Sequence, residues 1–278
     1  MSQSLPPRCA DRYRHVRLAG TGAHGAVYLA TQLDLDRPVA VKVLHFEVSR
    51  DVETVTRFGQ EARFTAGLAH PNIVRLIEHD LDDDPPWIVY EYLDGLTLHQ
   101  VVQKGPMSWR SALAATAQVL AALEVAHNAG ILHRDIKPSN VMQVGEDAFK
   151  LTDFGLARLA MGNEKVTRTG CIVGTPAYLA PEVMQGAEHS KSSDLFAVGA
   201  MLYKLATGQV PPRHDLVMAP GHLEDPGLPA PSAVVKSVPP AVDRLVRGCT
   251  HRDPAARWPT AQALKRAVEE AIADPENG

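Results

Sequence analysis

Three polar residues near the middle of the chain have types and spacing that suit chemistry on a phosphate group. Asp135 and Asn140 lie five positions apart, and Asp153 follows thirteen positions later. A carboxylate such as that of Asp135 can accept the proton of an attacking hydroxyl. An Asn amide and a second carboxylate can hold a divalent metal on the phosphates. Phosphoryl transfer needs such a metal clamp and a residue that orients the nucleophile, so the spacing favours this reaction.

A glycine-rich segment upstream could bind the phosphates of a nucleotide. Residues 20–27 match the pattern G-x-G-x-x-G-x-V, and apolar residues on both sides predict a hairpin between two strands. Glycine lets the backbone approach phosphate oxygens closely. A dinucleotide-binding turn has a similar spelling but needs a helix that begins at the last glycine. The residues after Gly25 predict a strand instead, which favours the hairpin.

Lys42, on the strand predicted next, could supply positive charge to the same phosphates. Because side chains on a strand alternate between faces, Ala40 and Lys42 point the same way. A lysine among apolar neighbours needs a carboxylate partner. The candidates are Glu61 and Glu53, both on a helix predicted from about Val52 to Leu68.

In this order and spacing, the motifs resemble those of protein kinases. The resemblance covers about Tyr13 to Ile272, and the spelling of Gly174–Glu182 after two threonines is that of bacterial eukaryotic-like serine/threonine kinases. It implies an α+β bilobal kinase fold, with a small β-rich N-lobe that carries one helix and a larger, mainly helical C-lobe. It also implies the boundaries: 1–12 as an N-terminal tail, 13–93 as N-lobe, 94–272 as C-lobe and 273–278 as a C-terminal tail.

The resemblance assigns roles in transfer of the γ-phosphate of ATP to protein hydroxyls. The catalytic positions correspond to Asp135, Lys137, Lys42, Glu61 and Thr175, and the metal ligands to Asn140 and Asp153. Mg²⁺ is the expected metal, for which Mn²⁺ could substitute. The expected ATP contacts are Leu18, Gly20, Thr21, Gly22, Ala23, His24, Gly25, Val27, Ala40, Lys42, Tyr90, Glu91, Leu93 and Met142. Tyr90 would stand at the rear of this pocket and make it shallow.

The position of Lys137, two residues after Asp135, resembles serine/threonine-directed kinases, and Thr175 supports the same specificity. Glu61 rather than Glu53 matches the family's position for the partner of the lysine. The resemblance also implies supporting residues: His133, Arg134, Phe154, Glu182, Asp194 and Arg257. Among them, His133 would pack against Phe154, Asp194 would hold the backbone beside Asp135, and Glu182 would pair with Arg257.

The chain departs from the family pattern at two places. Thr65, one turn after Glu61, stands where kinases usually have an apolar residue. Eight prolines between Val210 and Pro240 leave little room for the helix that kinases usually have there.

The segment between Asp153 and Glu182 resembles an activation loop. Thr167 and Thr169 lie inside it and are the expected sites of autophosphorylation. Arg134 and Arg158 could bind a phosphothreonine there, because phosphorylation adds nearly two negative charges and three hydrogen-bond acceptors. The resemblance thus implies a role in signal transduction.

Length and composition agree with one two-lobed domain. The chain has 278 residues, of which 45% are apolar, and its formal net charge of −4 gives no reason to expect nucleic-acid binding. Three scattered cysteines fit reduced thiols rather than a disulfide framework or a zinc site. The sequence shows no secretion signal and no run of about 18 apolar residues. We therefore expect a cytoplasmic chain without a membrane segment.

Two other classes of protein share part of this pattern. A pseudokinase scaffold would bind partners without transferring phosphate, but every catalytic position is present here. A small-molecule kinase such as an aminoglycoside phosphotransferase would lack the peptide-docking segment, which ends here at Ala180–Glu182. The sequence therefore favours an active kinase that acts on Ser/Thr hydroxyls of proteins. Because no sensor segment is evident, we expect control by a regulatory partner, by a neighbouring polypeptide or by a segment outside this sequence.

Overall fold

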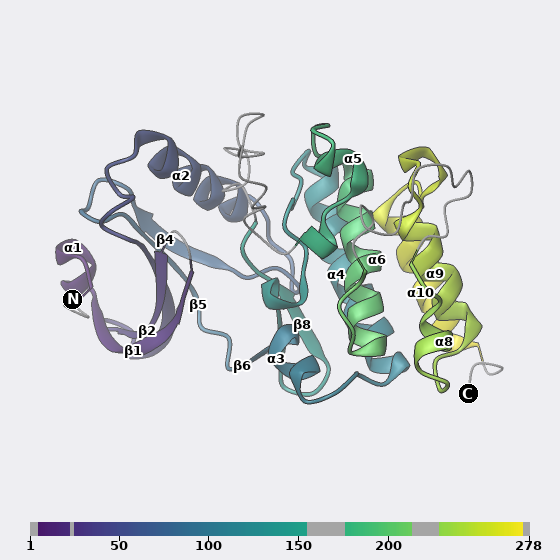
Figure 1. Ribbon diagram of the computed structural model, residues 1–278. Coiled ribbons are helices and arrows are strands. Elements are labelled where there is room, and N and C mark those ends of the chain that lie inside the picture. Colours follow the sequence, from purple (N-terminus) through teal and green to yellow (C-terminus); the bar gives the residue numbers. More distant parts are fainter. Residues whose placement is uncertain (1–4, 23–24, 155–175, 213–227, 275–278) are drawn as a thin grey trace. The chain divides into compact units, whose positions relative to one another are not determined.

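The computed structural model describes residues 5–22, 25–154, 176–212 and 228–274. Within these ranges the chain divides into two compact units, one that ends at Asp94 and one that begins at Gly95. Each unit has its own sheet, and the second also contains most of the helices (Figure 1).

The first unit is built on a five-stranded antiparallel sheet. Its strands are β1 (Tyr13–Thr21), β2 (Gly25–Gln32), β3 (Arg37–Leu44), β4 (Leu76–Asp80) and β5 (Trp87–Glu91), in the order β1-β2-β3-β5-β4. Lys42 on β3 is paired with Ile88 on β5, and Ala40 with Tyr90. One face of the sheet carries a core of fully buried side chains that includes Val39, Val41 and Val89. The sheet therefore holds the predicted nucleotide-binding residues on a packed scaffold.

The N-terminal segment differs from the expected tail of residues 1–12. Residues Pro7–Ala10 form helix α1, and Leu5 and Cys9 are buried in the core of the sheet. Asp83, in the turn between β4 and β5, accepts hydrogen bonds from two backbone amides of this segment at 3.0 and 3.3 Å. The prediction was wrong because a proline-rich stretch of this length has no periodicity, and its partners lie far along the chain.

Helix α2 (Val52–Ala66) lies beside β4 in the first unit (Figure 1). Asp51 caps its N-terminus by accepting a hydrogen bond from the Thr54 amide at 3.1 Å. The helix ends two residues before the predicted Leu68. A Cβ atom at Gly59 would lie 2.6 Å from a Leu81 methyl group, so glycine allows the β4–β5 turn to pack on the helix backbone.

The second unit combines a three-stranded sheet with a helical core. The strands are β6 (Gly95–Thr97), β7 (Val141–Val144) and β8 (Ala148–Leu151), in that order. The helices described are α3 (Leu98–Gln103), α4 (Trp109–Asn128), α5 (Pro181–Met184), α6 (Lys191–Thr207), α8 (Pro231–Val234), α9 (Pro240–Thr250) and α10 (Ala261–Ala273). Short 3₁₀ turns occur at Pro138–Asn140, Pro176–Tyr178 and Pro254–Ala256.

Helix α6 is the centre of this unit. It buries 14 of its 17 residues, as expected for a helix that is surrounded by other elements. Helices α4 and α9 both pack against it, and α10 packs on α4 (Figure 1). The Ser108 hydroxyl caps α4 by accepting a hydrogen bond from the Ser111 amide at 3.1 Å.

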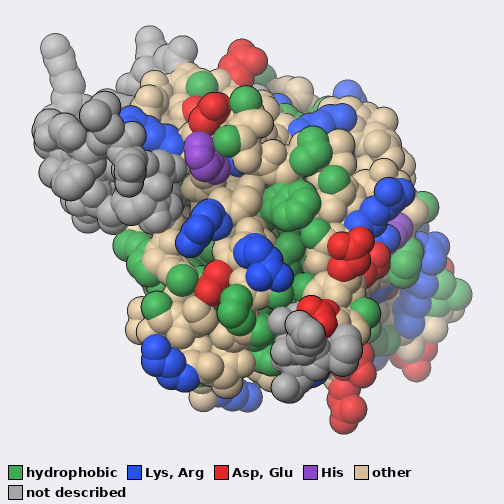
Figure 2. All heavy atoms as spheres, turned by 90° about the vertical axis from the view of Figure 1, so that its right-hand side faces the viewer, with side chains coloured by type: hydrophobic (Ala, Val, Ile, Leu, Met, Phe, Trp, Pro, Cys, Tyr) green, Lys and Arg blue, Asp and Glu red, His purple; other side chains and the backbone are tan. Residues whose placement is uncertain are grey.

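The proline-rich stretch is described only at its two ends, because residues 213–227 fall outside the described ranges. Its described part contains the four-residue helix α8. Among the described residues, no helix is both long enough and apolar enough to cross a membrane. On the face shown in Figure 2, acidic and basic side chains are interspersed, so this face has no extended field of one sign.

Candidate active site

Lys42 and Glu61 meet in the first unit, as predicted. Lys42 Nζ lies 2.7 Å from Glu61 Oε1, and the two side chains are 21% and 6% exposed. The alternative partner, Glu53, is 69% exposed and pairs with Arg57 on its own helix. A buried carboxylate needs a counter-charge, and Lys42 supplies it for Glu61. The ion pair therefore holds Glu61 in place in addition to the packing of α2.

Tyr90 makes a contact that the sequence did not predict. It is buried on β5, and its hydroxyl donates a hydrogen bond to Glu61 Oε1 at 3.1 Å. The sequence placed this residue at the rear of the nucleotide pocket as a bulky ring. No local pattern could have revealed the hydroxyl's partner, which lies 29 positions earlier on a different element.

The glycine-rich hairpin forms where the pattern placed it. Gly20 is paired with Val27, and the Gly22 amide donates to the Gly25 carbonyl at 2.8 Å, which closes the turn. A Cβ atom at Gly25 would lie 2.4 Å from the Val43 carbonyl oxygen, so close strand pairing requires this glycine. Around Gly20 nothing described lies within 4 Å of such an atom, so packing does not explain that glycine.

Other predicted ATP contacts lie on neighbouring strands or outside the described residues. Leu18 and Thr21 are on β1, and Ala40 is on β3. Glu91 ends β5, with its amide donating to the Arg75 carbonyl at 2.9 Å, and Leu93 follows in a buried position. Met142 lies on β7 of the second unit. Ala23 and His24 are outside the described residues.

The second unit brings Asp135, Lys137 and Asn140 together. Lys137 Nζ lies 2.6 Å from Asp135 Oδ2, and the Asn140 side-chain amide donates to the same oxygen at 3.0 Å. The Asn140 amide also donates to the Asp135 backbone carbonyl at 2.8 Å. These bonds fix the orientation of the amide group, so its oxygen is the atom that can ligate a metal. A carboxylate, an ammonium and an amide thus converge at one place.

Asp153 has an unusual backbone conformation at the end of β8. Its φ angle of 52° lies in the left-handed region, and its side chain is exposed while its neighbour Phe154 is buried. Carboxylate and amide oxygens are the ligands that Mg²⁺ prefers, and Mg²⁺ usually keeps few protein ligands. No group of three or more His, Cys, Asp or Glu residues suited to a metal occurs among the described residues. Asp153 and Asn140 therefore offer the kind of oxygen ligands that would hold such a metal.

Asp194, at the start of α6, supports the backbone around Asp135. Its buried carboxylate accepts hydrogen bonds from the amides of His133 and Arg134, at 2.9 and 2.8 Å. His127 Nε2 lies 2.9 Å from the same carboxylate. Burial alone would raise the pKa of Asp194, but the hydrogen bonds from His127 and from the Arg134 amide help to hold this pKa below its usual range. The predicted role of Asp194 as a backbone anchor is confirmed.

His127 is a residue that sequence reasoning missed. His127 is buried near the end of α4. A buried histidine needs a hydrogen-bond partner, and that requirement was the available signal.

His133 packs against Phe154, as predicted. Their ring centroids are 4.8 Å apart. Nε2 lies 3.1 Å from the Thr152 carbonyl, and Nδ1 accepts from the Asp135 amide at 3.3 Å. Both contacts are satisfied by the neutral ring with its proton on Nε2. Burial lowers the pKa of His133, which favours this neutral form.

Arg134 presents buried cationic atoms without a partner among the described residues. Its Nε and Nη1 atoms are buried and make no hydrogen bond there. The backbone of Arg134 is in the left-handed region, with φ of 68°. A buried guanidinium without an acceptor is costly, so this position suits an anion. Thr167, Thr169 and Thr175 fall outside the described residues.

The remaining supporting residues, Glu182 on α5 and Arg257 directly after the 3₁₀ turn Pro254–Ala256, lie in the second unit. Both terminal nitrogens of Arg257 lie 2.7 Å from the carboxylate oxygens of Glu182, which confirms the predicted ion pair. The Arg257 side chain also lies over the ring of Phe196, 5.0 Å from its centroid.

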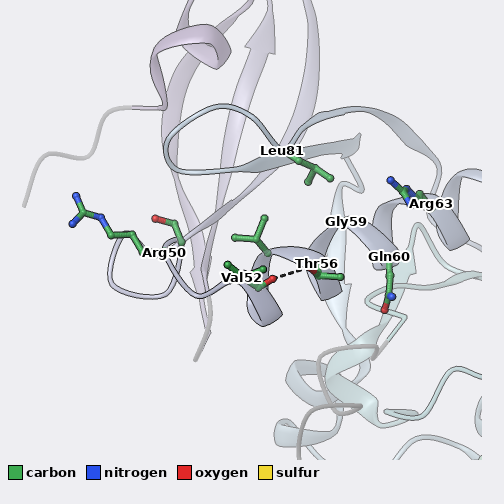
Figure 3. A pocket seen from close by; sticks show the side chains of 9 residues that line it. Arg50, Val52, Thr56, Gly59, Gln60, Arg63 and Leu81 are labelled. Atoms are coloured by element: carbon green, nitrogen blue, oxygen red, sulfur yellow. Dashed lines mark hydrogen bonds between the residues drawn. The ribbon is translucent and has the colours of Figure 1, made fainter.

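A surface hollow of about 440 Å³ lies elsewhere on the first unit. It is lined by the outer side of α2, the residues before it and Leu81 (Figure 3). Arg50 and Arg63 lie at opposite ends of the view, and none of the predicted ATP contacts lines the hollow. The hollow is therefore not the predicted ATP-binding site.

The comparison with known proteins decides the family. The protein kinase domain family matches residues 13–268. The chain belongs to this family. The resemblance to bacterial eukaryotic-like serine/threonine kinases and the protein-kinase fold are thereby confirmed.

Several bacterial kinases are similar to this protein kinase domain. It is 43% identical over 266 residues to the serine/threonine-protein kinase PksC of Streptomyces coelicolor, covering 91% of this chain and 48% of that protein. Identity to PrkC of Bacillus subtilis is 36% over 268 residues, covering 95% of this chain and 41% of PrkC. This kinase domain therefore spans about half the length of these two relatives or less.

A solved structure has the same fold. The crystal structure of the Mycobacterium tuberculosis PknI kinase domain matches with a TM-score of 0.70 and 27% identity. The match covers 93% of this chain and 95% of that chain.

Proposed function

We propose that this domain is a serine/threonine protein kinase that transfers the γ-phosphate of ATP to protein hydroxyls. The observation that carries the proposal is the convergence of Lys137 and Asn140 on the Asp135 carboxylate. Asp135 orients the acceptor hydroxyl and accepts its proton as the oxygen attacks. Lys137 stabilises negative charge on the transferring group.

The first unit binds the nucleotide in this proposal. Lys42 contacts the α- and β-phosphates, and Glu61 holds the ammonium in position. The backbone at Glu91 and Leu93 binds the adenine, and the glycine-rich hairpin covers the phosphates. The backbone hydrogen bond between Gly22 and Gly25 and the open space around Gly20 support that role, because glycine lets the backbone approach phosphate oxygens closely.

A divalent metal, with Mg²⁺ preferred and Mn²⁺ as a substitute, completes the proposal. Asn140 and Asp153 would hold it, and it would neutralise charge on the phosphates. The fixed amide of Asn140 and the exposed carboxylate of Asp153 support this assignment.

Regulation by autophosphorylation is part of the proposal. Thr167 and Thr169 are the proposed sites, and Thr175 would contact the catalytic residues when a substrate is bound. The buried Nε and Nη1 atoms of Arg134 support this assignment, because they suit a phosphate group. We also propose a regulatory partner and a cytoplasmic location, where ATP is available.

The test is transfer of radiolabelled phosphate from ATP to a general protein substrate and to the domain itself. We expect phosphoserine and phosphothreonine, and no incorporation by the Asp135→Asn variant. Binding of ATP without any transfer by the wild-type domain would instead indicate a pseudokinase scaffold. Transfer to a small molecule but not to any protein would indicate a small-molecule kinase.

A further inference from the structure

Glu61 accepts two hydrogen bonds on a single buried oxygen. Lys42 Nζ and the Tyr90 hydroxyl lie 2.7 and 3.1 Å from Glu61 Oε1. The donors come from two adjacent strands, and the acceptor comes from α2. A buried carboxylate with two donors is held more firmly than one with a single ion pair, because each donor offsets part of its lost hydration.

The sheet fixes the position of the Tyr90 hydroxyl. Its backbone is paired with Ala40 on β3 and with Leu76 on β4, so Tyr90 has a strand on each side. The Tyr90 ring is buried, which limits its rotamers. The hydroxyl is therefore a fixed reference point to which the side chain of Glu61 is bound.

The hydrophobic anchoring of α2 is weak. Five residues of α2 are buried. Only two of them, Phe58 and Ala62, have apolar side chains. The other three are Gly59, Glu61 and Thr65. Since apolar burial is the usual force that holds a helix in place, α2 depends more than most helices on the polar contacts of Glu61.

We propose that Tyr90 is a positioning residue, which holds Glu61 and therefore α2 in place when Lys42 is engaged with phosphates. This inference rests on the proposed function, in which Lys42 divides its hydrogen bonds between Glu61 and the nucleotide. An ammonium has three donors, and each one given to a phosphate weakens its hold on the carboxylate. The Tyr90 hydroxyl is an uncharged donor that reaches Glu61 from the sheet, so its hydrogen bond adds to the hold of Lys42 on this carboxylate.

The chain offers a matched control for the hydroxyl. Tyr13 is also buried in the first unit, and its hydroxyl donates to Glu78 at 2.8 Å. Glu78 pairs with Arg12 and not with Lys42. Tyr90→Phe and Tyr13→Phe therefore each remove one tyrosine–glutamate hydrogen bond, but only in the first does the glutamate belong to α2.

The experiment combines amide hydrogen exchange with steady-state kinetics. In Tyr90→Phe, the amides of residues 52–66 should exchange faster than in the wild type, and in Tyr13→Phe they should not. We expect kcat/KM for ATP to fall by about tenfold in Tyr90→Phe, the size expected for one hydrogen bond to a buried charge. The loss should appear in kcat more than in KM, because phosphate alignment rather than adenine binding depends on Glu61.

A double-mutant cycle tests whether Tyr90 acts through Glu61. In a Glu61→Ala background, Tyr90→Phe should have no further effect on residual transfer. Additive effects, or equal exchange of α2 in both tyrosine variants, would overturn the inference. If the wild-type domain transfers no phosphate, the proposed function fails, while hydrogen exchange still decides whether Tyr90 holds α2.

Discussion

Arg257 and Glu182 lie 75 positions apart in the chain and form an ion pair with two contacts of 2.7 Å. The Arg257 side chain is 0% exposed. Its Nε atom also donates to the His251 carbonyl at 2.7 Å. The guanidinium thus links the short helix α5 to the segment that follows α9 and is fully desolvated.

Replacement of Arg257 by Gln should destabilise the domain strongly. Removal of one partner leaves the Glu182 carboxylate without its counter-charge, and such changes cost about 3–5 kcal/mol. Urea unfolding followed by circular dichroism measures the effect. Lys265→Gln is the control, because Lys265 pairs with Glu269 at 3.9 Å on the surface of α10, where pairs contribute about 1 kcal/mol or less. Similar losses in both variants would contradict the assignment of Arg257 as a buried anchor.

Lys42→Met should lower transfer by orders of magnitude and leave the fold intact. Met fills similar space without the charge, so the loss reflects the phosphates and Glu61 rather than packing. Glu61→Gln should give a smaller loss, and the double variant should lose less than the sum of the two in free energy. Kinetics of all three variants, with thermal unfolding as the check on folding, measure this coupling. Strict additivity would mean that the 2.7 Å pair has no role in transfer.

Asp153→Asn should abolish transfer more completely than nucleotide binding. The carboxylate is proposed to hold the metal, while the adenine pocket contributes binding of its own. Asn tolerates the left-handed backbone at this position, so the fold should persist. Titration with a fluorescent ATP analogue and a phosphate-transfer assay separate the two effects. Asp147→Asn, at an exposed position before β8, is the control and should behave like the wild type.

The neutral state of His133 should make stability depend on pH. Burial lowers its folded pKa, although the nearby carboxylates, Asp194 foremost, favour the charged form. The unfolded state therefore binds a proton that the folded state rejects, and the stability that depends on the neutral ring is lost as pH falls below about 6.5. Urea unfolding between about pH 5 and pH 8 should show a shallower slope in His133→Phe.

Incubation with ATP and Mg²⁺ should phosphorylate Thr167 and Thr169. Mass spectrometry locates the phosphates, and Asp135→Asn is the inactive control. The double variant Thr167→Ala/Thr169→Ala should phosphorylate peptides several-fold more slowly, with thermal stability little changed, because the buried guanidinium of Arg134 would lack its anion. Full activity of the double variant would place regulation elsewhere, and Thr65 on α2 is the next candidate.

The residues that the motifs identified most clearly also make the side-chain contacts that the sequence predicted for them. The Lys42–Glu61 pair, the packing of His133 on Phe154 and the Glu182–Arg257 pair were all expected before the fold was known. Such predictions succeed because each motif combines residue types that carry charge or a special backbone with a characteristic spacing. The predicted roles of Thr167, Thr169 and Thr175 stay predictions, because these residues lie outside the described ranges.

The sequence by itself determined the family, the order of the elements and the local groups such as Asp135, Lys137 and Asn140. Only the tertiary structure decided the contacts between distant segments that no motif indicates. Tyr90 meets Glu61 across 29 positions, His127 meets Asp194 across 67, and the Cys9 amide meets Asp83 across 74. A local pattern records the periodicity and turn chemistry of its own segment, whereas a hydrogen bond between two segments depends on how both pack. The hydrogen bond from Tyr90 to Glu61 depends on packing in this way.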